Sequence, residues 1–548
     1  MKPSRWLAAA AVLALLSLLA CAPRAEPTST PTPGPGTTPP LAQATATPTP
    51  TPTPAPRRGG TLNFGADATL KTLDPVWTTA AVTNLYAIEL WEPLFAWDAS
   101  FEARPMVAER WEASDDLRSW TITIREGITY HDGTTRTADD VIPSMERWGA
   151  RAPLGTSYFR LVDRVEKVDE RTVRITFNKP FGLAIAYLSN APYIMPKGVA
   201  SKPADERIET FIGSGPFRLL DWREGDRLVF ERYEGYQPRG EPTSGRAGAR
   251  LVYVDRVVSK EVPDAATRVS ALEVGELDAA HLVPPDFLTQ LSNNPRVRVY
   301  AHKPGSIAMT VFNNVFFPSD QQKFREAVAL VQDPREYMAL AYGPEELWDV
   351  CSAVFFCGGK WETHVAEDRY LAVNVERARQ LIQEVKQETG WDGKVIVMTN
   401  TDYSSLYQLG QITERDLREK LGLTVDFQVM DWATLVTRRA EKQGWNIFHT
   451  GWSFAGAHDP FVAGWLGPQW FAWYDNAEMQ RLQEDLATAP DDAARMRIVE
   501  QIQEKVYQEW PIVPHGMSFS ISARGQWLKE YLELDGFTAV WWNAWLDR

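Results

Sequence analysis

A histidine and an aspartate stand side by side in an aromatic-rich stretch near the C-terminal end, His458 and Asp459 in GWSFAGAHDPFVAGW. A carboxylate beside an imidazole can serve proton transfer, and both side chains can ligate metals. A serine hydrolase would also need a nucleophile held against the histidine, and the chain has no GxSxG motif to supply one. We therefore interpret Asp459 as the cap of a turn before Pro460, and His458 as a residue that faces a cleft or solvent.

Aromatic and acidic side chains follow the ends of several expected elements, and such side chains can hold a solute without reacting with it. Aromatic faces suit sugar rings, apolar side chains or cations, and carboxylates add polar anchors. Each aromatic residue alone is more often part of a core than of a binding site. The candidate ligand contacts are Trp77, Thr78, Asp402, Tyr403, Trp432, Trp452, Phe454 and Asp459, with Asp431 as a further polar anchor.

The C-terminal half alternates helices with short apolar strands. Strands are expected in KVIVMTN, LTVDFQVM and WNIFHTGW, and a helical stretch precedes each of them. This alternation predicts parallel strands with crossover helices. Ligands of open α/β sheets bind beyond the carboxyl ends of the strands, and that rule selects the loops TNTDYSS, MDW and GWSFAGAHDP.

The N-terminal half is rich in expected hairpins instead. Apolar and polar residues alternate in SWTITIREGITYHDG, in VEKVDERTVRITF and in PFRLLDWREGDRLVFERY. A helix is expected to start after Thr137, because Asp140 follows three residues later. Pro143 lies inside that helix and is expected to kink it.

The N-terminus has the pattern of a secretory signal. Lys2 and Arg5 precede a short apolar run, and LLAC ends at Cys21. The apolar run is shorter than the about 20 residues that a membrane-spanning helix needs. LLAC resembles the bacterial lipobox, which implies a lipoprotein signal peptide over residues 1–20 and a lipid on the Cys21 thiol. Several acyl chains would then hold the protein on a membrane surface, at the outer face of the cytoplasmic membrane.

Residues 21–58 are expected to form a tether. This stretch contains TPTSTPTPGPGTTPP and shows no apolar periodicity, so it cannot bury a core. Proline at every second position favours polyproline II, in which about 35 residues at about 3.1 Å each reach roughly 100 Å. A long stalk of this kind separates the membrane anchor from the folded part.

The folded part from Gly59 on holds about 490 residues, too many for one core, so two or more domains are expected. The full chain carries a net charge of −14, which argues against nucleic-acid binding. The 22 tryptophans are enough to line a cleft as well as a core. Cys351 and Cys357, in CSAVFFC, predict a disulfide outside the cell. Free thiols or two zinc ligands are the alternatives, but no CxxC or nearby His–Cys cluster supports zinc.

Several motifs together resemble the family 5 solute-binding proteins, the extracytoplasmic receptors of ABC importers for di- and oligopeptides, nickel and some sugars. The resemblance starts with LKTLDPVWTTAAVTNLYAIELWEPLF and ARPMVAERWEASDDLRSWTITIREGITYHDGTTRTADDV. It continues with GSGPFRL, VFNNVFFPSDQQKFREAVALVQDPREY and PIVPHGMSF, and it covers essentially the whole chain after Gly59. In this family His131 corresponds to a turn residue remote from the cleft.

The resemblance implies an α/β, two-lobed periplasmic-binding-protein-like fold (type II, cluster C) with an extra β-rich subdomain in the N-terminal lobe. It places the first lobe at residues 59–305, the second at 306–512 and a return to the first at 513–548. A small-molecule or peptide ligand would bind between the lobes of a monomer and close them, for delivery to ABC importer permease subunits. No reaction, no cofactor and no metal follow from it, and the location is the cell surface or periplasm.

One departure from the family pattern concerns the ligand. Peptide receptors of this family hold the α-ammonium of the peptide with an aspartate, whose nearest counterpart here is Ala455. A buried ammonium without that carboxylate is costly, so free peptides are in doubt. Blocked peptides, oligosaccharides or another organic solute remain open. A nickel site on His449 and His458 is disfavoured because the seven histidines are scattered. A secreted sugar-cleaving hydrolase and the ligand-binding part of a sensor are the alternative functions.

Overall fold

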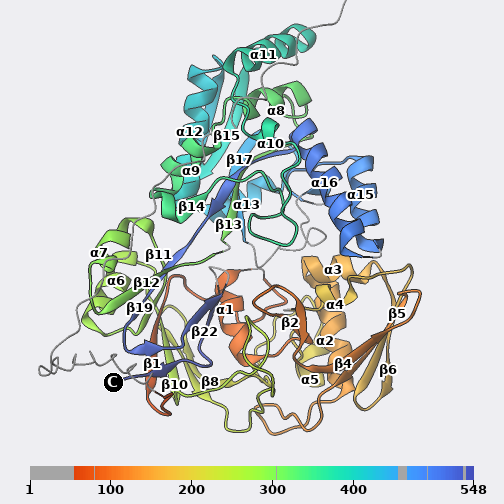
Figure 1. Ribbon diagram of the computed structural model, residues 1–548, viewed down its shortest axis with the longest axis vertical. Helices are drawn as coiled ribbons and strands as arrows, with labels where there is room; N and C mark the ends of the chain where they lie inside the picture. Colours follow the sequence, from red (N-terminus) through yellow and green to blue (C-terminus); the bar gives the residue numbers. More distant parts are fainter. Residues whose placement is uncertain are drawn as a thin grey trace, which may run out of the picture. The chain divides into compact units, whose positions relative to one another are not determined.

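The computed structural model describes residues 55–548 except Thr79, Asn190, Pro304, residues 454–465, Gln469, Pro490 and residues 535–537 (Figure 1). Residues from Pro56 to Arg548 form one compact unit. The signal peptide, Cys21 and nearly all of the tether lie outside the described residues. So do Phe454, Ala455, His458 and Asp459. None of the described helices is both long and apolar enough to cross a bilayer.

The first lobe is built on a seven-stranded sheet with the order β12-β19-β11-β1-β10-β9-β8. The central strand β1 runs parallel to β10 and β11, and β19 runs antiparallel to both of its neighbours. The strands are β1 Thr61–Ala66, β8 Phe217–Arg223, β9 Arg227–Arg232, β10 Arg256–Glu261, β11 Ala279–Val283, β12 Val297–Ala301 and β19 Ile521–Gly525, and the adjacent helices are α1 Ala81–Leu90 and α6 Ala265–Val274.

The core of this lobe contains an aromatic residue from the C-terminal end of the chain. Trp541 is fully buried, and its ring centroid lies 5.0 Å from that of Phe230 and 5.7 Å from that of Phe64. Tyr86 and Phe217 surround the same ring at 6.0 and 5.9 Å. Helix α1, strand β1 and the last residues of the chain are therefore packed into one core.

A four-stranded antiparallel sheet, β4-β5-β7-β6, forms the predicted β-rich subdomain (Figure 1). The hairpins follow the sequence alternation, and α2 begins as its capping pattern predicted, with Asp140 Oδ2 accepting the N–H of Thr137 at 2.8 Å. Helix α2 continues through Pro143. The elements are β4 Ala108–Ala113, β5 Ser119–Ile124, β6 Val162–Asp169, β7 Thr172–Phe177, α2 Ala138–Arg151 and α3 Pro153–Phe159.

The second lobe is a six-stranded sheet with the order β14-β18-β13-β17-β15-β16. Strand β15 runs parallel to β16 and β17, which confirms the predicted crossover units, whereas β13 is antiparallel to β17 and β18. The strands are β13 Ser306–Phe312, β14 Trp348–Asp349, β15 Lys394–Asn400, β16 Thr424–Met430, β17 Ile447–Ser453 and β18 Ile512–Ser518. The helices include α8 Gln322–Ala329, α9 Pro334–Tyr342, α11 Val375–Thr389, α12 Ser404–Glu419, α13 Trp432–Arg439, α15 Ala477–Thr488 and α16 Asp492–Glu509.

Two adjacent segments connect the lobes. The first runs from β12 to β13 and the second from β18 to β19, and the N–H of His302 donates to the Ser520 carbonyl at 2.9 Å. A side chain at Gly305 would place its Cβ 1.9 Å from the Ser518 carbonyl oxygen, so glycine allows the close approach. Because β18 still pairs with β13, the strand pairing puts the return to the first lobe between Ser518 and Ile521 rather than at residue 513.

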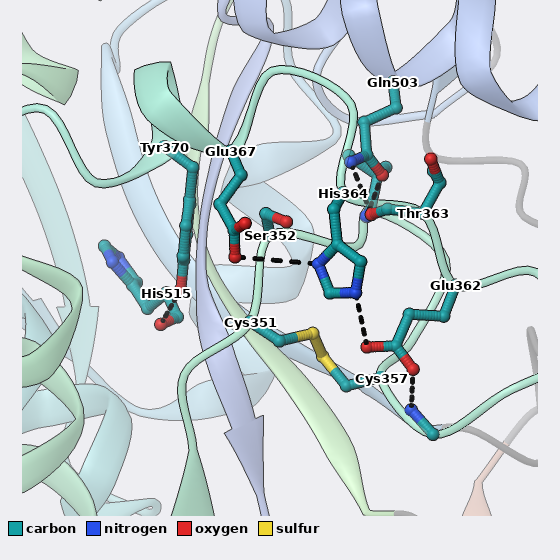
Figure 2. Close-up of a disulfide and its surroundings, with 12 residues drawn as sticks. Cys351, Ser352, Cys357, Glu362, Thr363, His364, Glu367, Tyr370, Gln503 and His515 are labelled. Carbon is teal, nitrogen blue, oxygen red and sulfur yellow. Dashed lines mark hydrogen bonds and ion pairs between the residues drawn. A yellow bond between two sulfur atoms is a disulfide. The ribbon is translucent and has the colours of Figure 1, made fainter. Parts of the chain in front are cut away.

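A disulfide closes a loop of the second lobe (Figure 2). Cys351 and Cys357 are joined, with Cα atoms 6.2 Å apart, as the spacing predicted. The loop is also held by hydrogen bonds to α16, since Tyr507 Oη donates to the Ser352 carbonyl at 2.6 Å and Gln503 Oε1 accepts the N–H of Val354 at 3.0 Å. The disulfide therefore stabilises a loop that is already packed against a helix.

A buried carboxylate, Glu92, ties the first lobe to its subdomain. Arg136 Nη1 lies 3.2 Å from Glu92 Oε2, and Tyr236 Oη donates to Glu92 Oε1 at 3.1 Å. Arg136 also donates to Ser214 Oγ at 2.9 Å, and Arg125 Nη1 lies 3.9 Å from Glu92. Burial opposes ionisation, but the surrounding guanidinium groups, Arg136 first, lower the pKa of Glu92 overall. We call these five residues the Glu92 cluster.

The pKa of Glu89, three residues earlier, is shifted in the opposite direction from that of Glu92. It is fully buried, its Oε1 accepts the backbone N–H of Trp541 at 2.8 Å, and its Oε2 has no hydrogen-bond partner among the described residues. Burial raises the pKa of Glu89 to about 8, against the smaller opposing effects of the Trp541 N–H and Arg250.

Candidate functional site

The loop after β15 brings three candidate residues together at the start of α13. Asn400 Oδ1 accepts the backbone N–H groups of Asp402 at 3.1 Å and Tyr403 at 2.9 Å. Asp402 Oδ2 in turn accepts the N–H of Trp432 at 2.8 Å. The rings of Tyr403 and Trp432 meet edge to face with centroids 5.3 Å apart. Because Tyr403 is 51% exposed, this ring pair presents an aromatic surface to solvent.

The two described carboxylates that were expected to be polar anchors both accept backbone N–H groups of α13. Asp402 accepts the first N–H of α13, and Asp431 Oδ1 accepts the N–H of Thr434 at 3.0 Å. The first N–H groups of a helix lack partners within the helix, so both carboxylates satisfy donors at the start of α13. The third expected anchor, Asp459, lies outside the described residues.

Arg439 occupies the buried face of α13, where Trp432 and Leu435 also lie. Its guanidinium carbon is 4.0 Å from the ring centroid of Phe471, 5.2 Å from that of Trp432 and 5.7 Å from that of Phe448. Its Nε is buried, and no described residue accepts a hydrogen bond from it. Burial lowers the pKa of Arg439 to about 10, so the side chain stays charged at neutral pH.

Further aromatic contacts extend this cluster to Trp452 at the end of β17. The rings of Phe471 and Trp470 lie 5.7 Å apart, and Trp470 meets Trp452 edge to face, also at 5.7 Å. The contacts form a continuous series at the carboxyl ends of β15, β16 and β17. We define the aromatic arc as Tyr403, Trp432, Phe471, Trp470 and Trp452, with Arg439 between Trp432 and Phe471.

In the first lobe, Asp74 fixes the loop that carries Trp77. Asp74 Oδ1 accepts the N–H groups of Val76 at 3.0 Å and Trp77 at 3.2 Å. Asp74 Oδ2 accepts Arg147 Nη2 at 2.8 Å and the N–H of Ile208 at 3.1 Å. Four bonds to one fully buried carboxylate leave the loop little freedom, so the position of Trp77 is well determined.

The half-buried Trp77 ring is flanked by two cations. The guanidinium carbon of Arg151 lies 3.6 Å from the ring centroid, and that of Arg207 lies 5.9 Å away. Thr78, the next candidate, uses its Oγ1 to accept the N–H of Ala80, at 3.1 Å, just before α1. Trp77 is thus available as a surface only where Arg151 does not cover it.

Electrostatics connects the aromatic arc to the first lobe. Burial raises the pKa of Tyr403, and the charges of Asp67 and Asp402 raise it further. Asp67 directly follows β1 of the first lobe, where its Oδ1 lies 2.7 Å from His281 Nδ1. Tyr403, which follows β15 of the second lobe, is therefore within electrostatic range of the carboxyl end of β1.

The described histidines lie in or at the edge of the interior, except His364, which is exposed beside Glu362 and Glu367. His449 Nε2 lies 2.9 Å from Thr413 Oγ1, and burial lowers the pKa of His449 to about 3. The Nδ1 of His131 accepts the N–H of Gly213, its Nε2 donates to the Gly215 carbonyl, and burial lowers its pKa to about 4. In the described part of the chain, no three His, Cys, Asp or Glu side chains are grouped so as to hold a metal ion.

The structure thus brings Asp402, Tyr403 and Trp432 into direct contact and links Trp452 to them through Trp470 and Phe471. Trp77 and Thr78 belong to the other lobe. Sequence reasoning did not select Trp470, Phe471 or Arg439 as candidates. The spacing of Trp432, Leu435 and Arg439, at i, i+3 and i+7, places all three on one helix face, and this signal marks Arg439 as a charge on an apolar stripe.

Comparison with known proteins identifies the family. The sequence profile described as "Bacterial extracellular solute-binding proteins, family 5 Middle" matches residues 102–473. The probable peptide ABC transporter periplasmic-binding protein y4tO of Sinorhizobium fredii is 30% identical over 475 residues, covering 83% of this chain and 88% of that protein. The glutathione-binding protein GsiB of Escherichia coli is 24% identical over 474 residues, with the same shares covered.

A solved structure supports the same fold. The oligopeptide-binding protein AppA of Bacillus subtilis, in complex with a nonapeptide, matches with a TM-score of 0.74 at 19% identity, covering 90% of this chain and 100% of that one. The chain therefore belongs to the family 5 bacterial extracellular solute-binding proteins, a family of transporter receptors, with the two-lobed α/β fold that its motifs predicted. It is the extracytoplasmic substrate-binding receptor of an ABC importer.

Proposed function

We propose that the receptor captures a peptide or a related organic solute as a monomer and delivers it, chemically unchanged, to the permease subunits of its importer. A lipid on Cys21 holds it at the outer face of the cytoplasmic membrane, and residues 21–58 serve as the stalk. Two relatives, one named for peptides and one for glutathione, support a ligand with peptide character. The ending LLAC of the signal supports the lipid anchor.

The observation that carries the proposal is the aromatic arc. Its rings lie at the carboxyl ends of three parallel strands, where open α/β sheets bind ligands. Aromatic rings bind flat or apolar groups over a large area with few rotatable bonds. The charge of Asp67, which follows β1 of the first lobe, contributes to the raised pKa of Tyr403, which supports a site close to the first lobe.

The ligand is proposed to lack a free α-ammonium. Ala455, the nearest counterpart of the ammonium-binding aspartate of peptide receptors, supplies no carboxylate. Asp402 and Asp431 already accept backbone N–H groups of α13. A buried ammonium with no carboxylate partner is strongly disfavoured, so a blocked, modified or absent amine fits better.

A thermal-shift screen of residues 59–548 tests the proposal, with paired free and N-acetylated peptides, glutathione, oligosaccharides, opine-like compounds and nickel. A ligand at about 100 times its Kd adds about 2.7 kcal/mol to the free energy of unfolding and raises the Tm. Trp432→Ala is expected to abolish the shift, whereas Trp111→Ala, on the exposed face of β4, is expected to keep it. Recovery of a consumed rather than intact compound would contradict the receptor function, and preference for free peptides would contradict the proposed amine chemistry.

The anchor has its own test. Expression of the full chain in a bacterial host should place it in the membrane fraction, and Cys21→Ser should release it to the soluble extracytoplasmic fraction. A membrane fraction unchanged by Cys21→Ser would contradict lipidation at that residue.

A further inference from the structure

We propose that Arg439 is an anion-binding residue, and that the ligand carries a carboxylate or a similarly compact anion next to an apolar or aromatic group. This inference rests on the proposed function, because it places the ligand on the aromatic arc. It names the substrate class and adds a specificity-determining residue to the site.

A second arginine of the same lobe shows how the fold treats a guanidinium that is only structural. Burial also lowers the pKa of Arg325 to about 10. Its Nε, however, donates to the carbonyls of Glu509 at 3.0 Å and Trp510 at 3.1 Å. Its Nη1 donates to the carbonyls of Ser319 and Asp320, both at 3.0 Å. In Arg325, therefore, backbone oxygens accept the hydrogen bonds of a buried guanidinium that serves the fold.

The neighbouring residue on α13 also has oxygen partners. Arg438 Nη1 donates to Gln428 Oε1 at 2.6 Å, and its Nη2 donates to the Gly444 carbonyl at 3.2 Å. Arg439, one residue later, donates to none of the residues that the structure describes, and no described carboxylate adds to its electrostatics. The helix is therefore already anchored by Arg438, and Arg439 has five N–H donors left over.

The surroundings of Arg439 determine what kind of group those donors can accept. Ring faces attract a cation, but they offer no oxygen to the N–H groups in the plane of the guanidinium. A carboxylate fits two of these N–H groups at once, which is the strongest arrangement available to arginine. The half-buried rings of Trp432 and Phe471 lie within 5.2 Å of the guanidinium carbon, so the apolar part of the same ligand would lie against them.

The overall charge of the chain makes a local cation necessary for such a ligand. The net charge is −14, so the protein as a whole repels anions at long range. A cation in surroundings of low polarity, with no counterion among the described residues, offsets that repulsion over a few ångströms. The receptor would then admit an anionic solute only where its apolar part also matches the arc.

The test uses the full chain in mild detergent and measures Kd by quenching of tryptophan fluorescence. The probes are N-acetylated di- and tripeptides ending in phenylalanine or tryptophan, and glutathione, each as the free acid and as the carboxamide. Sulfate and phosphate alone distinguish a solute carboxylate from a free inorganic anion. The variants are Arg439→Met and Arg439→Lys, with Arg438→Met as the matched control on the same helix.

Binding of the acids at least about tenfold tighter than the amides is expected in the natural chain and in Arg438→Met. Arg439→Met should remove that preference, and Arg439→Lys should restore only part of it because lysine lacks the planar fork. Equal binding of acids and amides, or a preference that survives Arg439→Met, would overturn the anion site while leaving the receptor function intact. Tight binding of sulfate or phosphate alone would overturn the carboxylate assignment. Binding of no probe by any variant, with no small molecule co-purifying, would overturn both proposals.

Discussion

The Glu92 cluster of the first lobe and the surroundings of Arg439 in the second lobe hold buried charge in opposite ways. In the cluster, Glu92 has Arg136, Arg125 and the Tyr236 hydroxyl as partners, and its pKa is lowered. Arg439 has three aromatic rings around it and no partner oxygen among the described residues, and its pKa is lowered by burial alone.

The charges of the Glu92 cluster are paired and stabilise the fold, whereas the charge of Arg439 is available to bind a ligand. Removing one partner of a buried pair leaves the other charge uncompensated and costs about 3–5 kcal/mol, whereas replacing an unpaired buried charge by an apolar group costs little or stabilises. Stability measurements on single variants can therefore test the comparison directly, without knowledge of the ligand.

Arg136→Met is expected to give the largest effect, a loss of about 3–5 kcal/mol in the free energy of unfolding, because Glu92 would lose its closest guanidinium. Urea denaturation followed by circular dichroism measures it. Lys71→Met, which breaks the exposed ion pair between Lys71 and Glu224, serves as the control and should leave the unfolding midpoint unchanged. If both variants behave alike, the Glu92 cluster does not hold the fold.

The next effect concerns Glu89 and pH. The folded-state pKa of about 8 lies above the ordinary 4.5, so the folded protein binds more protons than the unfolded chain between these values. The contribution of Glu89 to stability is therefore complete below about pH 4.5 and is lost as pH rises towards 8, by at most about 1.4 kcal/mol per pH unit.

Comparing Tm between pH 5 and 8 for the natural chain and Glu89→Gln isolates this contribution. The natural chain should lose stability relative to the variant as pH rises. If the difference in Tm between the natural chain and Glu89→Gln does not change with pH, Glu89 is ionised in the folded protein, as Glu92 is.

Removal of the disulfide is expected to have a smaller effect. Chain-entropy arithmetic for a loop of this size gives about 2 kcal/mol, and the hydrogen bonds of the loop to Tyr507 and Gln503 remain in its absence. The double variant Cys351→Ala, Cys357→Ala, compared with the natural chain with and without reductant, measures it. If reductant lowers the Tm of the double variant as well, the loss of Tm that reductant causes in the natural chain does not come from the disulfide.

Arg439→Met is expected to have the smallest effect on stability, within about 1 kcal/mol and with either sign, because no described oxygen loses a partner. The same urea denaturation used for Arg136→Met measures it. A loss as large as that of Arg136→Met would show that Arg439 has a structural role, and the comparison between the two regions would fail.

The fold was largely predictable because the apolar residues of each lobe recur with the spacing of strands or helices. The alternation of KVIVMTN, LTVDFQVM and WNIFHTGW with helices predicted β15, β16 and β17 as parallel neighbours, and the alternating patterns of the N-terminal half predicted the hairpins β6–β7 and β8–β9. The antiparallel position of β13 was not predictable in this way, since a strand next to crossover units carries no local mark of its direction.

The site was predictable only at the level of loops. Strand ends selected the segments of Tyr403, Trp432 and Trp452, but not the contacts between them. Asp402 was predicted to be a polar contact of the ligand. The sequence does not show that its carboxylate accepts the N–H of Trp432. Arg439 follows another arginine in TRRAEKQG. Helical spacing places Arg439 on the apolar stripe, but only the three-dimensional neighbourhood shows that Arg438 has oxygen partners and that Arg439 has none among the described residues.

The way the chain crosses twice between the lobes has a consequence for its biosynthesis. Strand β19 lies between β12 and β11, and Trp541 fills the middle of the first lobe, yet both follow the whole second lobe in the chain. The first lobe therefore cannot complete its sheet or its core until the whole second lobe has been synthesised. Synthesis begins with the first lobe, but residues that follow the second lobe in the chain complete its sheet and its core.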